Sequence, residues 1–183
     1  RDCLLSRGLG DVYKRQSPNG RFVTVCGDGE YTIFTALAWR NKAFGSALGF
    51  AWASDSSTYA IRENSTTRVR VFKNFKEQSG LVLVNYVVEG IAGGALLAVI
   101  GVGFVCFYDW VSGTLVRRIN VDARQIFWSQ TNELVVITTV DSFYVLRFQR
   151  AAYEAFVESG MPSDGDGFED AFDVIAEVNE TYV

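Results

Sequence analysis

The chain of 183 residues contains no histidine, only two prolines and only three cysteines. Because histidine is the commonest general base and metal ligand, its absence excludes Ser-His-Asp hydrolases and argues against most zinc sites. The cysteines are widely separated, with no CxxC pair, so neither a zinc ribbon nor a disulfide framework is indicated. Prolines are scarce and only 21% of residues are charged, which argues against wholesale disorder.

Other catalytic and cofactor-binding patterns are also missing. Gly101-Val102-Gly103 lacks the third glycine and the helix start of a dinucleotide fingerprint, and no GxxxxGK phosphate loop is present. The acidic run DGDGFED at 164–170 lacks the glycine and the final glutamate of a calcium-binding EF-hand loop, so we interpret it as a solvated acidic loop. We therefore expect no catalytic, metal or cofactor-binding residues, and we expect that the chain is not an enzyme.

Charge is distributed unevenly along the chain. Residues 17–150 contain 13 Lys and Arg against 10 Asp and Glu, whereas residues 151–183 contain nine acids and no basic residue. No concentrated basic stripe is present, so a nucleic-acid partner is not indicated.

The first 16 residues differ from the rest of the chain. Asp11–Gln16, DVYKRQ, can be encoded by GATGTGTATAAGAGACAG, which matches a transposon end used to fragment DNA for sequencing. We interpret residues 1–16 as a translated adapter, disordered and outside the fold. A natural basic N-terminal tail is the alternative.

The strongest pattern is a repeat of about 37 residues. Four turn-like segments recur at this interval: SPNGRF from Ser17, SDSSTY from Ser54, IAGGAL from Ile91 and SQTNEL from Ser129. The hydrophobic residues that end these segments are Phe22, Tyr59, Leu96 and Leu134. A repeat of this length is the size of one propeller blade, which cannot cover its own faces and therefore stacks on its neighbours.

Short β-branched runs follow each turn and favour strands over helices. They read FVTVCG, YAIREN, LLAVIG and LVVITT, and each precedes a second apolar run. Trp52 and Trp128 end two matching lead-in strands and are expected to anchor the core between blades. Residues 17–150 are thus predicted to be about four blades of an incomplete, all-β propeller. A β-sandwich is the alternative, but it has no reason to repeat its turns so regularly.

One segment supports a different interpretation. Residues 90–108 contain no charged side chain and are long enough for a transmembrane helix, so a membrane protein anchored there is the alternative function. Five glycines and the register with the other repeats favour two buried strands joined at Gly101–Gly103.

Residues 151–183 are predicted to form a short helix, an acidic loop and a strand. Ala151–Ser159 contains helix formers and is followed by Gly160 and Pro162, a typical helix end. Apolar residues alternate over Phe172–Val178, which indicates a half-buried strand that begins a further blade. The spacing of Phe168, Phe172 and Ile175 also fits a helix, which is the alternative.

From Ser17 onward the chain resembles the beta-prime subunit family of coatomer, the coat protein I vesicle coat. The stretches that carry the resemblance are SPNGRFVTVCGDGEYTIFTALAWRNKAFGSALGFAWASDSSTYAIRE, VRVFKNFKE, FYDW, LVRRINV, IFWS and GFEDAFDVIAEV. Residues 77–105 depart from the family pattern because they are more uniform in composition and more apolar.

The resemblance implies part of the second propeller of a WD-repeat protein and a structural scaffold role in Golgi-to-endoplasmic-reticulum and intra-Golgi transport. It implies other coatomer subunits as partners, above all the alpha subunit, and a cytoplasmic protein peripheral on Golgi membranes and coat vesicles. Cargo tails would bind elsewhere in the parent protein, so no cargo-binding residue is assigned. Partner-binding residues stay unknown, although Arg40, Lys42 and Asp122 are expected to lie exposed in loops.

Overall fold

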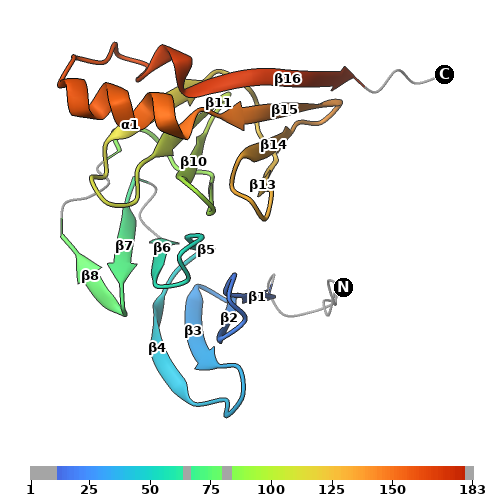
Figure 1. Ribbon diagram of the computed structural model, residues 1–183. Helices are drawn as coiled ribbons and strands as arrows, with labels where there is room; N and C mark the ends of the chain where they lie inside the picture. Colours follow the sequence, from blue (N-terminus) through green and yellow to red (C-terminus); the bar gives the residue numbers. More distant parts are fainter. Residues whose placement is uncertain (1–11, 64–66, 80–83, 180–183) are drawn as a thin grey trace.

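The computed structural model describes residues 12–63, 67–79 and 84–179. These residues form four antiparallel sheets of four strands each, one helix and one short 3-10 helix (Figure 1). Each sheet is built from four consecutive strands, so the chain completes one sheet before it starts the next. We refer to the sheets as blades 1 to 4.

Blade 1 contains β1 (Tyr13–Gln16), β2 (Phe22–Gly27), β3 (Glu30–Thr35) and β4 (Asn41–Ser46). Blade 2 contains β5 (Gly49–Trp52), β6 (Thr58–Arg62), β7 (Val69–Lys73) and β8 (Lys76–Gln78). Blade 3 contains β9 (Gly90–Ala92), β10 (Leu97–Gly101), β11 (Phe104–Tyr108) and β12 (Leu115–Ile119). Blade 4 contains β13 (Gln125–Trp128), β14 (Leu134–Thr138), β15 (Ser142–Phe148) and β16 (Phe172–Asn179).

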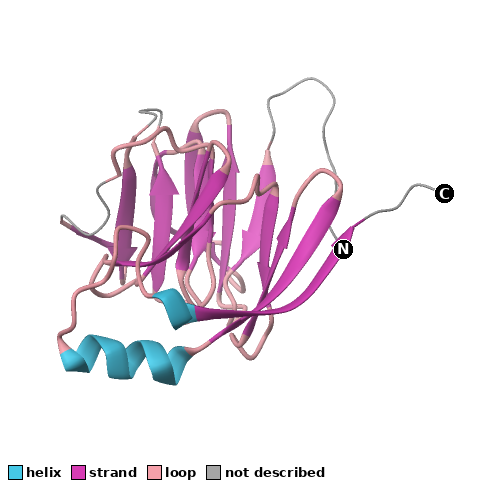
Figure 2. Ribbon diagram, turned by 90° about the horizontal axis from the view of Figure 1, so that it is seen from above, coloured by secondary structure: helices cyan, strands magenta, loops and turns pink. Residues whose placement is uncertain are grey.

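The blades follow one another as a fan, with blade 1 and blade 4 at opposite ends (Figure 1), and their strands stand side by side when seen from above (Figure 2). Three apolar clusters lie between consecutive blades, since each contains buried residues from two neighbouring sheets. The first strand of blade 3, β9, contacts the first strands of both blade 2 and blade 4, β5 and β13. This arrangement confirms the prediction of a partial β-propeller of about four blades.

The turn between the first and second strands has the same backbone hydrogen bond in three of the four blades. The amide of Ser17 donates to the carbonyl of Phe22, and Ser129 donates to Leu134 in the same way. In blade 2 the matching bond runs from Ala53 to Thr58. Thr58, rather than Tyr59, is therefore the counterpart of Phe22, and the alignment of the second repeat was wrong by one residue.

This shift matters because neighbouring residues of a strand point to opposite faces of the sheet. Left-handed backbone at Gly20, Ser56 and Asn132 marks the same place in each turn and supports the corrected alignment. With Thr58 in this position, Tyr59 points toward blade 1 and Ala60 toward blade 3.

The N-terminal boundary of the fold also needs correction. Tyr13–Gln16 forms β1, which pairs with β2 from Tyr13 opposite Cys26 to Gln16 opposite Val23. The expectation that residues 1–16 are disordered is thus wrong for 13–16, because β2 offers a free edge that this segment fills. Residues 1–11 lie outside the described residues, and the adapter origin of the segment stays a prediction.

The membrane-helix alternative is also wrong. Residues 90–108 form β9, β10 and β11, and the hairpin between the last two pairs Gly101 with Phe104. Val99 and Val105 are completely buried between blades. Within the described ranges, no helix is long and apolar enough to cross a bilayer.

The C-terminal segment adds a helix and completes blade 4. Helix α1 (Arg150–Ser159) ends at Gly160, which has left-handed backbone, as the sequence predicted. The 3-10 helix η1 (Glu169–Ala171) leads into β16, which pairs with β15 over its whole length. The strand prediction is confirmed, but β16 is the outer strand of blade 4 rather than the start of a further blade.

Candidate interaction surfaces

Aromatic side chains join blade 1 to blade 2. Trp52 stacks on Phe22 with ring centroids 5.9 Å apart, and its indole Nε1 donates to Thr24 Oγ1 at 3.1 Å. Tyr59 stacks on Phe72 and lies edge-on to Tyr31 of blade 1. Such contacts stabilise the interface beyond the area that they bury. Trp52 is therefore a core anchor between blades, as the sequence predicted.

Two glycines of the third repeat allow its turn to approach both neighbouring blades. A Cβ on Gly93 would lie 1.9 Å from the carbonyl oxygen of Trp52, so only glycine fits. The carbonyl of Gly94 accepts hydrogen bonds from the amide of Ser54, in blade 2, and from Trp110 Nε1, both at 3.0 Å. The interface between these blades therefore contains hydrogen bonds as well as apolar packing.

The acidic loop between α1 and β16 is docked on blade 3. The Arg118 amide donates to the Asp166 carbonyl at 2.7 Å, and the Phe168 amide donates to the Val116 carbonyl at 2.7 Å. Gly167 bridges to Arg117 in an antiparallel manner. We call residues 164–168 the strap, because they extend from blade 4 across the outer strand of blade 3.

The strap brings acidic side chains to basic ones. Asp164 lies 3.9 Å from Arg117, and Asp166 lies 3.9 Å from Arg118, in pairs that are exposed enough to contribute little on their own. Phe168 stacks on Phe156 of α1 with centroids 4.5 Å apart, which attaches the helix as well. The sequence identified this segment as a solvated acidic loop; the structure shows that its backbone covers a sheet edge.

An ion-pair group lies on blade 2. The Arg70 guanidinium donates to both carboxylate oxygens of Glu77 and, at 2.9 Å, to Glu63. The hydrogen bond with Glu77 raises the pKa of Arg70, and the same bond lowers the pKa of Glu77. The ion pair with Glu77 joins β7 to β8, the outer strand of the blade.

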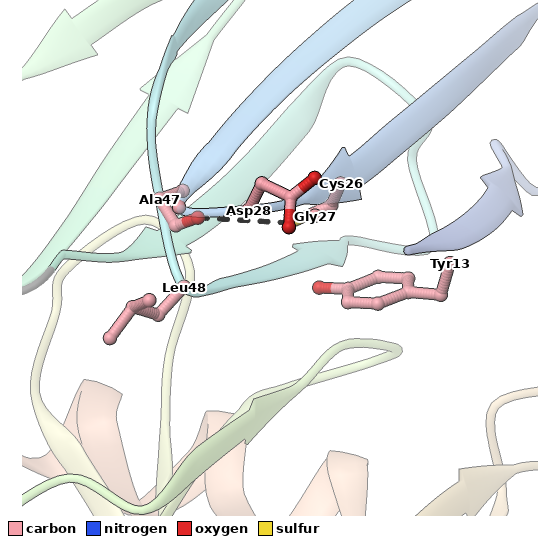
Figure 3. Close-up of a pocket in the computed structure, with 7 residues that line it drawn as sticks. Tyr13, Cys26, Gly27, Asp28, Ala47 and Leu48 are labelled. Carbon is pink, nitrogen blue, oxygen red and sulfur yellow. Dashed lines mark hydrogen bonds between the residues drawn. The ribbon is translucent and has the colours of Figure 1, made fainter. Parts of the chain in front are cut away.

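A shallow pocket of about 270 Å³ lies where blade 1 meets the start of blade 2 (Figure 3). The residues that line it are Tyr13, Cys26, Gly27, Asp28, Gly29, Ala47 and Leu48. Burial raises the pKa of the Cys26 thiol, and burial also raises the pKa of the Tyr13 hydroxyl, which accepts a hydrogen bond from the Phe50 amide. The raised pKa values favour the protonated forms of both groups.

The structure does not bring the three suggested contact residues together. Arg40 and Lys42 are exposed as predicted, but Lys42 lies in β4, the outer strand of blade 1, rather than in a loop. Asp122 is exposed in the connection to blade 4, where it lies 3.5 Å from Arg124. Cys26 and Cys106 are buried as free thiols in different blades. No group of three His, Cys, Asp or Glu side chains that could hold a metal is found over residues 12–63, 67–79 and 84–179.

Stacked blades with docked sheet edges are the architecture of a β-propeller, and the family comparison agrees. Residues 13–182 match the model of the COPA/B second beta-propeller. The chain belongs to this family. The matched range includes β1, in agreement with the pairing of Tyr13–Gln16 in blade 1.

Curated relatives share nearly half of the residues. The chain is 47% identical to coatomer subunit beta′-1 of Oryza sativa subsp. japonica over 94% of its own length, and 49% identical to coatomer subunit beta′ of Rattus norvegicus over 91%. It spans 19% and 18% of these two relatives, about a fifth of their length.

Solved structures show the same fold at low identity. Hsv2 of Kluyveromyces lactis matches with a TM-score of 0.60 at 12% identity, over 98% of this chain and 59% of that one. Hydrazine synthase of Kuenenia stuttgartiensis matches with a TM-score of 0.58 at 16% identity, over 81% of this chain and 49% of that one. These similarities concern the fold alone.

Proposed function

We propose that the chain is a structural module of a coatomer beta′ subunit and acts as a scaffold in the vesicle coat. The observation that carries this proposal is 47% identity to a coatomer beta′ subunit over 94% of the chain. As a family member it contributes propeller blades, whose stacked sheets form a stiff body with loops and edges for docking. No catalytic step is part of the proposal.

The proposal extends to partners and location. Other coatomer subunits, with the alpha subunit first among them, are the expected partners, and cargo tails are expected to bind elsewhere in the parent protein. The protein would be cytoplasmic and peripheral on Golgi membranes and coat protein I vesicles, and would serve Golgi-to-endoplasmic-reticulum and intra-Golgi transport. The finding that supports peripheral association is that residues 90–108 form strands.

Affinity purification of the protein that contains this sequence tests the assignment. We expect the tagged protein to recover the other coatomer subunits, identified by mass spectrometry, and to be released from membranes by carbonate. Recovery of the tagged protein without any coatomer subunit would overturn the proposal. Retention on membranes after carbonate extraction would overturn the peripheral location.

A further inference from the structure

The strap on the edge of blade 3 lies between two elements that are held independently of it. Before the strap, α1 packs on blade 3 through Tyr153, which is buried and whose hydroxyl lies 3.4 Å from Thr114 Oγ1. After the strap, β16 pairs with β15 within blade 4. Departure of the strap from blade 3 therefore leaves α1 and the sheet of blade 4 in place.

Few interactions in the described residues attach the strap to β12. Two backbone hydrogen bonds join them, from the Arg118 amide to the Asp166 carbonyl and from the Phe168 amide to the Val116 carbonyl. The two ion pairs of the strap are 3.9 Å long and exposed, so they contribute little. Segments with few buried contacts open at a lower free energy than the core. The strap is therefore displaced more readily than the core strands of blade 3.

The strap leaves one charged group of the edge poorly matched. Arg117 lies opposite Gly167 in the antiparallel bridge, and a glycine has no side chain to offer it. The Arg117 side chain is 24% exposed, and its buried Nη1 has no hydrogen-bond partner in the part of the chain that the structure describes. The Asp164 carboxylate lies 3.9 Å away, and one of its oxygens already accepts from the Asp166 amide at 2.9 Å. A buried charged donor without an acceptor is unfavourable, so an anionic side chain would be favoured here.

The turn of the strap, rather than the edge of β12, requires a glycine opposite Arg117. Gly167 has a φ of 94°, and its amide donates to the Asp164 carbonyl at 3.2 Å to close the turn. With this left-handed backbone, a Cβ would lie 2.4 Å from the Val116 carbonyl oxygen. A segment that runs straight along β12 has extended backbone, whose side chains stand out from the sheet and clear the neighbouring strand. Such a segment places a glutamate opposite Arg117, and opposite charges in this position stabilise a strand pair.

We infer that the outer edge of β12 is a strand-addition site for an extended acidic segment of a partner protein, which displaces the strap. The segment carries Asp-Glu-Phe opposite Arg118, Arg117 and Val116. Its aspartate and phenylalanine take the places of Asp166 and Phe168, and its glutamate gives Arg117 the acceptor that the strap lacks. In this mode of recognition, main-chain hydrogen bonds give affinity and side chains give specificity.

The strap competes with such a partner because it is tethered beside the site. Its covalent attachment gives it a high effective concentration at β12, so a free segment binds weakly while the strap is docked. The strap is thus an intramolecular inhibitor, and its release exposes the site. The inference does not depend on the coat proposal.

Fluorescence anisotropy of labelled peptides with the full-length protein that contains this sequence tests the site. The probe is the sequence of residues 163–171 with Gly167→Glu, and the matched control is the same peptide with Gly167→Lys. We expect the glutamate peptide to bind the protein variant Gly167→Ala, whose strap is released, at least about tenfold more tightly than the native protein. The lysine peptide should bind this variant about tenfold more weakly than the glutamate peptide, because it brings like charge to Arg117.

A second substitution in the strap-released protein locates the site. Arg117→Gln should remove the preference for the glutamate peptide over the lysine peptide. Arg124→Gln, which changes an exposed arginine paired with Asp122, should keep that preference. Protected amide exchange at Val99 shows that blade 3 is folded in each variant. If Gly167→Ala fails this check, Phe168→Ala releases the strap instead, by removing its stack on α1.

The inference is overturned if the glutamate peptide does not bind the folded, strap-released protein. It is also overturned if the lysine peptide binds equally well, or if the preference survives Arg117→Gln. Self-association of the native protein that the glutamate peptide reverses would overturn the partner assignment, because the strap of a second copy would then be the occupant of the edge.

Discussion

Gly94 of blade 3 lies directly against the indole of Trp128 in blade 4: a Cβ on Gly94 would be 2.2 Å from Cδ1 of the ring. The carbonyl of the same glycine binds Ser54 of blade 2, so one residue contacts both neighbouring blades. The absence of a side chain at this position thus allows three sheets to meet.

Gly94→Ala should destabilise the fold by about 1–3 kcal/mol, because the new methyl group overpacks the interface and displaces Trp128. Urea unfolding followed by tryptophan fluorescence measures the change. The matched control is Gly165→Ala, since a Cβ there meets nothing within 4 Å and should change the stability by no more than about 0.5 kcal/mol. Equal effects of the two substitutions would contradict the close contact.

Trp52→Ala should cost about 3–5 kcal/mol, because the side chain is almost fully buried between blades 1 and 2. Trp128→Ala should cost less, about 2 kcal/mol, because its side chain is only partly buried. Leu37→Ala provides the control for an exposed apolar side chain. A stability loss for Trp128→Ala as large as that for Trp52→Ala would show that the two anchors are equivalent.

Gly167→Ala should release the strap from blade 3. Gly167 has left-handed backbone with φ of 94°, and a Cβ would lie 2.4 Å from the Val116 carbonyl oxygen. We expect faster amide hydrogen exchange at Arg118 and Phe168, whose hydrogen bonds hold the strap, and little change at Val99 in the core. Asp166→Asn, which removes only an exposed ion pair, should leave these exchange rates nearly unchanged. Protection that is unaltered in Gly167→Ala would contradict the docking.

Asp55 should make the stability of blade 2 depend on pH. Burial tends to raise the pKa of this carboxyl, but hydrogen bonds from Thr58 and Ser57 outweigh that effect and lower the pKa from its ordinary value of 3.8. The ionised form is therefore favoured by folding, and its contribution is complete above the unfolded pKa and lost as pH falls through the folded pKa.

Asp55→Ala should accordingly cost about 1 kcal/mol at neutral pH, because two turn amides lose their acceptor. The difference from the native chain should shrink as the solution is acidified below the ordinary carboxyl pKa. Urea unfolding at a series of pH values provides the measurement, and Asp122→Ala serves as a control in an exposed connection. If the stability difference between the variant and the native chain stays constant as the pH is lowered, the carboxylate charge has no role in the turn.

The sequence was sufficient for the local features because these depend on neighbouring residues. Alternating β-branched runs and Gly, Asn and Asp turns defined the strands, and Gly160 defined the end of α1. The repeat also indicated that residues 90–108 are strands, although their apolar composition fits a membrane helix equally well.

The alignment of the second repeat with the others could not be determined from the sequence. Thr58 and Tyr59 are both compatible with the end of the turn, and the hydrogen bond from Ala53 and the left-handed backbone of Ser56 identify Thr58. β1 was missed because pairing with β2, rather than its own composition, makes Tyr13–Gln16 a strand. The strap was interpreted as solvated because its partners, Val116 and Arg118, lie about 50 residues away in the chain.

The amino-acid sequence by itself determined the repeating blade, its turns and the family, since a repeated pattern and a long matching stretch are properties of the linear chain. Tertiary structure alone decided which face each strand presents and which segment covers the edge of blade 3. These depend on contacts between residues distant in sequence, and a shift of one residue in a strand reverses every side chain.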